Sequence, residues 1–198
     1  MTADRSRNLP DRFAQIPRRL LYFGRDREGV AAVEFALLVP IFIFLYLMSF
    51  QMTVGFSTAR KVSRAASTIA DLMTQQEEID TDDLTDMDAL AKAIMAPYST
   101  AGLTVKVTGI TLDSAADATV SWSWKSDGTQ PYATGLAVDV PTDLQATDSF
   151  LVHAEVQTTY NYLFFVPYMT SYTASSVNIY KEFYFRQRVG DGVTCTDC

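Results

Sequence analysis

The hydrophobic and polar residues of this chain follow three successive patterns, which are an unbroken apolar run, a helical repeat and an alternation. The apolar run covers residues 30–50 and contains a single charged residue, Glu34. As an α-helix this run is about 30 Å long, which is enough to cross the hydrocarbon core of a bilayer. We therefore predict a transmembrane helix over residues 30–56.

The transmembrane helix is predicted to continue as an amphipathic helix over residues 57–76. Apolar residues recur there at helical spacing, at Val62, Ala65, Ala66, Ile69, Leu72 and Met73. This repeat favours packing of one helix face on a folded domain. A second helix is predicted over about residues 82–96, because Pro97 would stop it. The acidic residues at its start suit the helix dipole and lack the ligand spacing of a calcium-binding loop.

Beyond residue 102 the apolar positions alternate with polar ones, which is the period of β-strands. Four strands are predicted, and they begin near Leu103, Val120, Phe150 and Val177. We expect an antiparallel sheet with one face against the helices and the other toward water or neighbouring subunits. The predicted fold class is α+β: a long N-terminal transmembrane helix continues into an amphipathic helix packed on an antiparallel four-stranded sheet.

The first two predicted strands carry finer signals. Apolar positions shift at Gly109, which indicates a β-bulge there. In the next strand Val120, Trp122 and Trp124 occupy alternate positions and are predicted to share one face.

Two connections between the strands are unusual. Residues 126–149 form a loop long enough to suggest a function of its own, which the sequence does not identify. Residues 163–169 are apolar and are expected to pack on the sheet or near the membrane surface.

The net charge of −7 conceals an uneven distribution along the chain. Residues 1–29 contain seven arginines and only four acidic residues, whereas acidic residues dominate beyond Glu34. Basic residues beside a single membrane helix stay in the cytoplasm. We predict a basic cytoplasmic leader (1–29), the transmembrane helix (30–56) and an α+β domain (57–198) in the periplasm or outside the cell. The acidic domain argues against nucleic-acid binding.

A motif at the start of the apolar run resembles a known family. Residues 29–37 read GVAAVEFAL and are followed by Pro40, and this string resembles the N-terminal segment of the TadE-like family. Residues 60–72 extend the resemblance, which covers about residues 25–76. Members of that family are pseudopilins or minor pilins of the tight-adherence (Flp/Tad) pilus. The resemblance therefore implies a pilin-like fold and a role in pilus biogenesis and surface adhesion.

The same resemblance implies processing. In prepilin-like proteins a membrane peptidase cuts after a glycine and leaves a glutamate as the fifth residue of the mature chain; Gly29 and Glu34 match these positions, so cleavage would expose Val30. The implied partners are the bacterial inner membrane, a prepilin peptidase, other pilus subunits and the assembly platform. Glycine can enter a narrow protease site in extended form, which agrees with this reading.

Three residues of the apolar run are assigned to helix packing and assembly: Glu34, Phe35 and Pro40. A carboxylate inside a bilayer is unfavourable unless it is paired, and the amine of a cleaved chain would supply a cation. Pro40 removes one helical hydrogen bond and predicts a bend. An uncleaved, permanently anchored scaffold or receptor is the alternative. A secretory signal peptide fits poorly, because the apolar run is too long for one.

No residue pattern predicts an enzyme, a metal site or a cofactor. His153 is the only histidine, and we expect a strand residue that is either hydrogen-bonded or solvent-facing. Cys195 and Cys198 can form a local disulfide, or pair with cysteines of another chain, in an oxidising compartment. Their spacing also occurs in redox motifs, so an anchored redox enzyme is a further alternative, although the pair does not open a helix after a strand.

Overall fold

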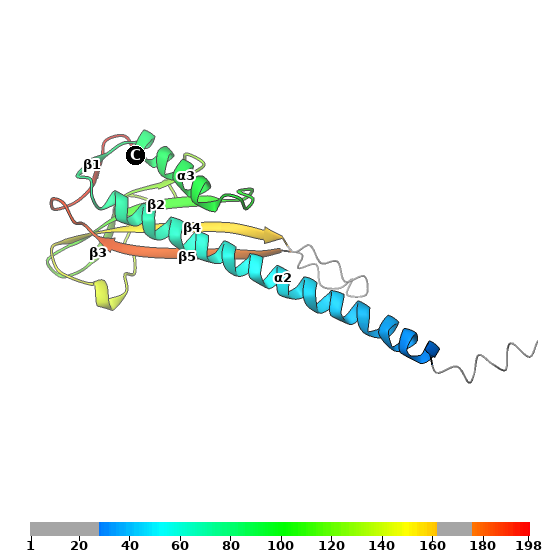
Figure 1. Cartoon of the computed structure of the whole chain (residues 1–198). Coiled ribbons are helices and arrows are strands. Elements are labelled where there is room, and N and C mark those ends of the chain that lie inside the picture. Colours follow the sequence, from blue (N-terminus) through cyan, green and yellow to red (C-terminus); the bar gives the residue numbers. More distant parts are fainter. Residues whose placement is uncertain (1–27, 162–175) are drawn as a thin grey trace, which may run out of the picture. The chain divides into compact units, whose positions relative to one another are not determined.

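The computed structural model describes residues 28–161 and 176–198 (Figure 1). Its backbone contacts separate the chain into two units, Met1–Ser49 and Phe50–Cys198. Most of the predicted leader and the apolar segment 163–169 lie outside the described residues. The predicted domain boundaries at residues 29 and 56 stay predictions.

The N-terminal helix α2 spans Glu28–Met73 and contains Pro40 without interruption. It is long and apolar enough to cross a membrane, and none of its most apolar stretch is buried by the residues that the structure describes. The predicted long apolar helix is therefore confirmed. From Val62 onward the helix buries a stripe of side chains that are 0% exposed: Val62, Ala65, Ala66, Ile69, Ala70 and Met73.

Helix α3 spans Thr81–Met95, within one residue of its predicted bounds at each end. Asp80 caps it, because its Oδ1 accepts a hydrogen bond from the Asp83 backbone N–H at 2.8 Å. The Asp83 carboxylate accepts in return from the Asp80 backbone N–H at 3.2 Å. In this reciprocal capping box, acidic side chains at the helix start accept hydrogen bonds from backbone N–H groups that have no partner within the helix.

Four strands form the predicted antiparallel sheet, and their order in it is β3-β2-β4-β5 (Figure 1). Their bounds are Thr104–Leu112 for β2, Ala118–Lys125 for β3, Ser149–Asn161 for β4 and Ser176–Arg186 for β5. Two short strands, β1 (Glu78–Ile79) and β6 (Thr194–Cys195), pair in parallel as a separate ribbon. A 3-10 helix, η1 (Thr142–Leu144), lies within the long loop.

The irregularity predicted at Gly109 is present, but the extra residue lies in β3. Pairing passes from Gly109–Trp122 to Ile110–Val120 and skips Ser121. The pairing of β2 with β4 continues without a break. The prediction that Val120 shares a face with Trp122 is wrong, because the bulge reverses the alternation and Val120 pairs with Ile110. The change in apolar positions along β2 instead marks where the strand begins to bury apolar side chains, Ile110 and Leu112, on the opposite face of the sheet.

One face of the sheet, here called the helix face, packs against α2 and α3. A single cluster joins the α2 stripe to residues of α3 and of every strand in the sheet. Its sheet members include Val107 of β2, Trp122 of β3 and Val152 of β4, while Phe183 of β5 packs at its edge. The predicted amphipathic packing of the helix on the sheet is thereby seen for this part of α2.

The opposite face, here called the loop face, is covered in part by residues 126–149. A second cluster contains Ile110, Leu112 and Leu151 from the sheet and Val140 from the loop. A bridge between Thr119 and Ala137 ties the loop to β3. The expectation that this face is turned to water or neighbours is therefore wrong where the loop folds back over it, and it holds at β5, where Tyr180 and Glu182 are exposed.

Candidate functional site

The residues predicted to direct processing and assembly lie in about the first four turns of α2. Val30 is 63% exposed and Phe35 is 69% exposed, and Glu34 and Pro40 are exposed as well. Large apolar side chains uncovered in this way require a lipid or protein environment to bury them. The segment therefore presents an apolar surface that the described part of the chain leaves uncovered.

Gly29 lies in the first turn of α2. A Cβ added there would meet no atom of the residues that the structure describes within 4 Å. Packing within this described part of the chain therefore does not require a glycine at this position. The first-turn N–H groups of a helix lack partners within the helix, so this turn can unwind into an extended form at small cost.

Val30 and Glu34 are one helical turn apart. Side chains in an α-helix slope toward its N-terminus, so the Glu34 carboxylate leans toward the turn that contains Val30. If the chain began at Val30, its amine would lie on the side toward which Glu34 points. This arrangement can pair the two charges within one chain or between neighbouring chains.

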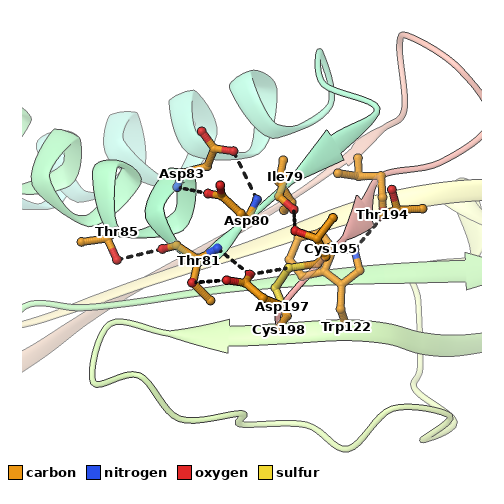
Figure 2. The surroundings of a disulfide bond; sticks show 12 residues. Ile79, Asp80, Thr81, Asp83, Thr85, Trp122, Thr194, Cys195, Asp197 and Cys198 are labelled. Carbon is orange, nitrogen blue, oxygen red and sulfur yellow. Dashed lines mark hydrogen bonds between the residues drawn. A yellow bond between two sulfur atoms is a disulfide. The ribbon is translucent and has the colours of Figure 1, made fainter.

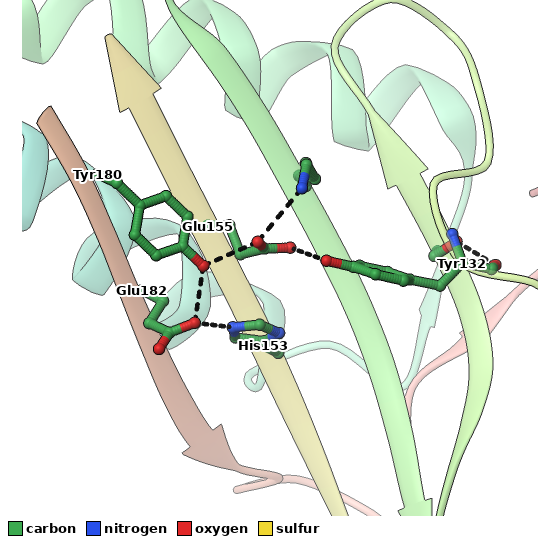
Figure 3. A network of polar contacts seen from close by, with 7 residues as sticks. Tyr132, His153, Glu155, Tyr180 and Glu182 are labelled. Carbon is green, nitrogen blue, oxygen red and sulfur yellow. Dashed lines mark hydrogen bonds and ion pairs between the residues drawn. The ribbon is translucent and has the colours of Figure 1, made fainter. Parts of the chain in front are cut away.

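A second candidate site is a polar cluster on the loop face, which we call the carboxylate cluster (Figure 3). It consists of Lys106, Tyr132, His153, Glu155, Tyr180 and Glu182. The sheet register sets most of these positions: Lys106 of β2 lies opposite Glu155 of β4, and Glu155 lies opposite Glu182 of β5. Tyr132 reaches the cluster from the long loop.

Glu155 is at the centre of the carboxylate cluster and is only 5% exposed. Its Oε1 accepts from Lys106 Nζ at 3.3 Å and from the Tyr180 hydroxyl at 2.8 Å. Its Oε2 accepts from the Tyr132 hydroxyl at 2.9 Å. A buried carboxylate needs such partners to remain charged.

Glu182 shares two of these neighbours. Its Oε2 lies 2.7 Å from the Tyr180 hydroxyl and 3.1 Å from His153 Nε2 (Figure 3). His153 is 8% exposed, and its ring stacks on Tyr184 with 4.0 Å between the ring centroids. The hydrogen-bonded alternative predicted for His153 is thus observed, and the solvent-facing one is wrong because Tyr184 and the neighbouring side chains cover the ring.

Burial and charge shift the pKa values of this cluster. Burial lowers the pKa of His153, despite the opposing effect of Glu155 and Glu182, which favours a neutral imidazole. Burial alone would raise the pKa of Glu155, but hydrogen bonds from Tyr180 and Tyr132, together with nearby positive charge, lower it overall. The pKa of Lys106 is raised, because attraction to Glu155 outweighs the effect of burial.

The C-terminal residues form a third local structure (Figure 2). Cys195 and Cys198 are joined by a disulfide, with 5.7 Å between their Cα atoms. Within this small loop, Asp197 accepts from the Thr81 backbone N–H at 2.8 Å and from the Thr81 hydroxyl at 2.7 Å. The loop therefore positions a carboxylate at the N-terminus of α3, where the helix dipole favours it.

The sequence identified His153 as a lone residue and missed Glu155 and Glu182 as its neighbours. Alternation along β4 places His153 and Glu155 on the same face, so part of the cluster could have been found from spacing. The pairing of β4 with β5 and the return of Tyr132 from the loop have no comparable signal. These long-range relations are what bring the cluster together.

Comparison with known proteins supports the predicted resemblance. Residues 29–71 match a protein family described as TadE-like protein. No curated protein and no solved structure gives a significant match to the chain. The matched residues all lie in α2, so the family relationship is carried by the N-terminal helix and ends before the sheet begins.

Proposed function

Taking the TadE-like character of residues 29–71 as the premise, we propose that the protein is a minor pilin or pseudopilin of a tight-adherence (Flp/Tad) pilus. The observation that carries this proposal is the placement of Gly29 and Glu34 at the start of an exposed apolar helix inside the matched segment. In this function the protein is made as a membrane precursor and acts in pilus biogenesis and surface adhesion.

In this proposal a prepilin peptidase cuts the chain after Gly29. The glycine fills no packing requirement among residues 28–161 and 176–198, and the first helical turn around it opens readily. Cleavage gives Val30 a charged amine one turn from Glu34. Pairing of these groups offsets the cost of a carboxylate in an apolar environment and sets the register between packed helices.

The proposed location is the bacterial inner membrane, from which the subunit enters the pilus or its assembly platform. The arginines of residues 1–29 keep the N-terminus in the cytoplasm, and the domain after the helix lies in the periplasm or on the surface. The partners are the peptidase, other pilus subunits and the platform. The domain is noncatalytic and binds no nucleic acid in this proposal, and its acidic charge supports the latter point.

N-terminal sequencing and intact mass of the membrane-purified protein test the processing step. We expect a mature chain that begins at Val30 in a host with the peptidase and a full-length chain when the peptidase gene is deleted. Gly29→Ala should block cleavage, whereas the matched control Gly55→Ala, at a second glycine of α2, should leave it intact. Recovery of only full-length protein from the wild-type host would favour the permanently anchored scaffold or receptor.

Incorporation into sheared filaments tests the role of Glu34. Removing one partner of a buried ion pair costs about 3 to 5 kcal/mol, so Glu34→Gln should reduce incorporation at least about tenfold while cleavage continues. Glu34→Asp keeps the charge and should recover part of the loss. Normal incorporation of the Gln variant would show that the carboxylate does not set helix packing.

A further inference from the structure

The carboxylate cluster contains three side chains that can ligate a metal. We propose that His153, Glu155 and Glu182 bind one divalent transition-metal ion on the loop face of the sheet. One possible ligand atom from each residue can be chosen so that the three atoms lie within 4.8 Å of one another. The sequence predicted no metal site, because a lone histidine gives no ligand spacing and the two glutamates join it only through strand pairing.

Two of the three proposed ligands have a separation close to that of a zinc site, and the third lies beside them on the same face. His153 and Glu155 project from the same face of β4, and Glu182 lies opposite Glu155 on β5. Ligand atoms of a tetrahedral zinc site are roughly 3.3 Å apart, as follows from zinc–ligand distances of about 2.0 to 2.1 Å. The observed separation of 3.1 Å between His153 Nε2 and Glu182 Oε2 is close to this value.

The charges around the cluster also favour a cation. Like charges placed directly opposite each other in adjacent strands are destabilising, and Glu155 and Glu182 have this relation. Lys106 neutralises only Glu155, at 3.3 Å. A divalent ion between the two carboxylates would remove the repulsion that Lys106 leaves.

The hydroxyl of Tyr180 lies close to the carboxylates of both Glu155 and Glu182, and its single proton cannot satisfy both of them. It lies 2.8 Å from Glu155 Oε1 and 2.7 Å from Glu182 Oε2, both within hydrogen-bond distance. A hydroxyl carries one proton and can donate to only one acceptor. The other contact therefore brings oxygen lone pairs together, and a metal ion between the carboxylates resolves this conflict as the Tyr180 side chain turns aside or becomes a ligand.

A neighbouring buried hydroxyl adds an independent observation. Thr108 lies opposite His153 on β2 and is 1% exposed. Its Oγ1 has no hydrogen-bond partner among residues 28–161 and 176–198. Buried polar atoms are rarely left unpaired without an unseen water or ion nearby.

The donor set indicates the class of metal. One neutral imidazole and two carboxylates suit zinc, manganese or iron, whereas calcium and magnesium prefer oxygen ligands alone. We use zinc as the probe because zinc is often held by three protein ligands, with water or substrate in the fourth position. A site of this kind would fasten β4 to β5 through their side chains.

Metal titration of the full-length, tag-free protein in detergent tests the proposal, with the Cys195–Cys198 disulfide kept intact. We expect saturable binding of one zinc ion by calorimetry and visible absorption bands with cobalt in its place. His153 is the only histidine of the chain, so its imidazole NMR resonances should also shift on zinc binding. This shift is measured on the wild-type protein and does not depend on the folding of any variant.

Variants identify the ligands. Loss of even outer-shell support weakens metal binding about 10- to 100-fold, so Glu182→Gln and His153→Asn should weaken zinc binding by at least that factor. Glu182 is exposed, which allows its variant to fold, and circular dichroism checks this. The matched control Asp86→Asn, at an exposed acid of α3, should bind as the wild type does.

Three outcomes would overturn the proposal. The first is the absence of saturable binding, which would leave the cluster a self-contained hydrogen-bond network. The second is undiminished binding by folded Glu182→Gln protein. The third is binding that disappears in a Cys195→Ser, Cys198→Ser double variant but persists in both ligand variants, because it would place the ion at the cysteines.

Discussion

On the helix face of the sheet, apolar side chains of every strand meet the apolar stripe of α2 and residues of α3. On the loop face, a small apolar cluster lies beside a row of charged and hydroxyl-bearing side chains. Both faces bury their central side chains, but the helix face does so by non-directional contact. The loop face depends on particular pairs, such as Glu155 with Lys106 and Glu155 with Tyr132.

This difference teaches how each face responds to change. Apolar burial is roughly proportional to area, so many side chains of similar shape can serve it. A buried charged side chain tolerates fewer substitutions, because replacing one member of a hydrogen-bonded pair leaves the other member buried without a partner. The loop face is therefore expected to tolerate fewer substitutions, and the helix face is expected to contribute most of the free energy of unfolding.

The largest effect is expected from a truncation on the helix face. Ile69 is 0% exposed, and Ile69→Ala should lower the free energy of unfolding by about 2 to 5 kcal/mol through lost apolar contact and a residual cavity. Urea unfolding of the full chain in detergent measures this change. Arg64→Ala, at an exposed position of the same helix, should stay within about 0.5 kcal/mol of the wild type. A loss below 1.0 kcal/mol, roughly the mean for point substitutions, would contradict the dominance of the helix face.

An intermediate and asymmetric effect is expected from the two facing glutamates. Glu155→Gln removes the charge that accepts hydrogen bonds from Lys106 and two tyrosines, and it should lower the free energy of unfolding by about 1 to 3 kcal/mol. Glu182→Gln removes the less buried carboxylate and relieves repulsion across β4 and β5, so it should be close to neutral. Both are measured in metal-free buffer by the same unfolding experiment. Equal losses from the two variants would show that burial does not distinguish them.

The smallest effect is expected where the long loop meets the cluster. Tyr132→Phe keeps the ring and removes only its hydrogen bond to Glu155, which should cost about 0.5 to 1.5 kcal/mol. Hydrogen exchange should quicken in residues 126–149 and remain unchanged in α3. Unchanged exchange in the loop would mean that its other contacts, including the bridge of Thr119 with Ala137, hold it without Tyr132.

Particular residues show where sequence reasoning succeeded and where it stopped. Spacing located α3 because Pro97 ends it, and alternation located all four strands. The face of Val120 was mispredicted, because a one-residue bulge at Ser121 changes which side every later residue faces. The coverage of the loop face was also missed, since a loop's path depends on distant contacts and leaves no periodic signal.

The sequence by itself determined the apolar helix, the TadE-like segment with Gly29 and Glu34, and the succession of the two helices and the four strands of the main sheet, but not the short strands β1 and β6. These features depend on residues close together in the chain, where composition and period act directly. Only the tertiary structure decided that Glu155 and Glu182 face each other beside His153, and that Asp197 lies at the start of α3. The physical reason is that strand register and chain reversal join residues far apart in sequence, and their energies depend on geometry that no local pattern contains.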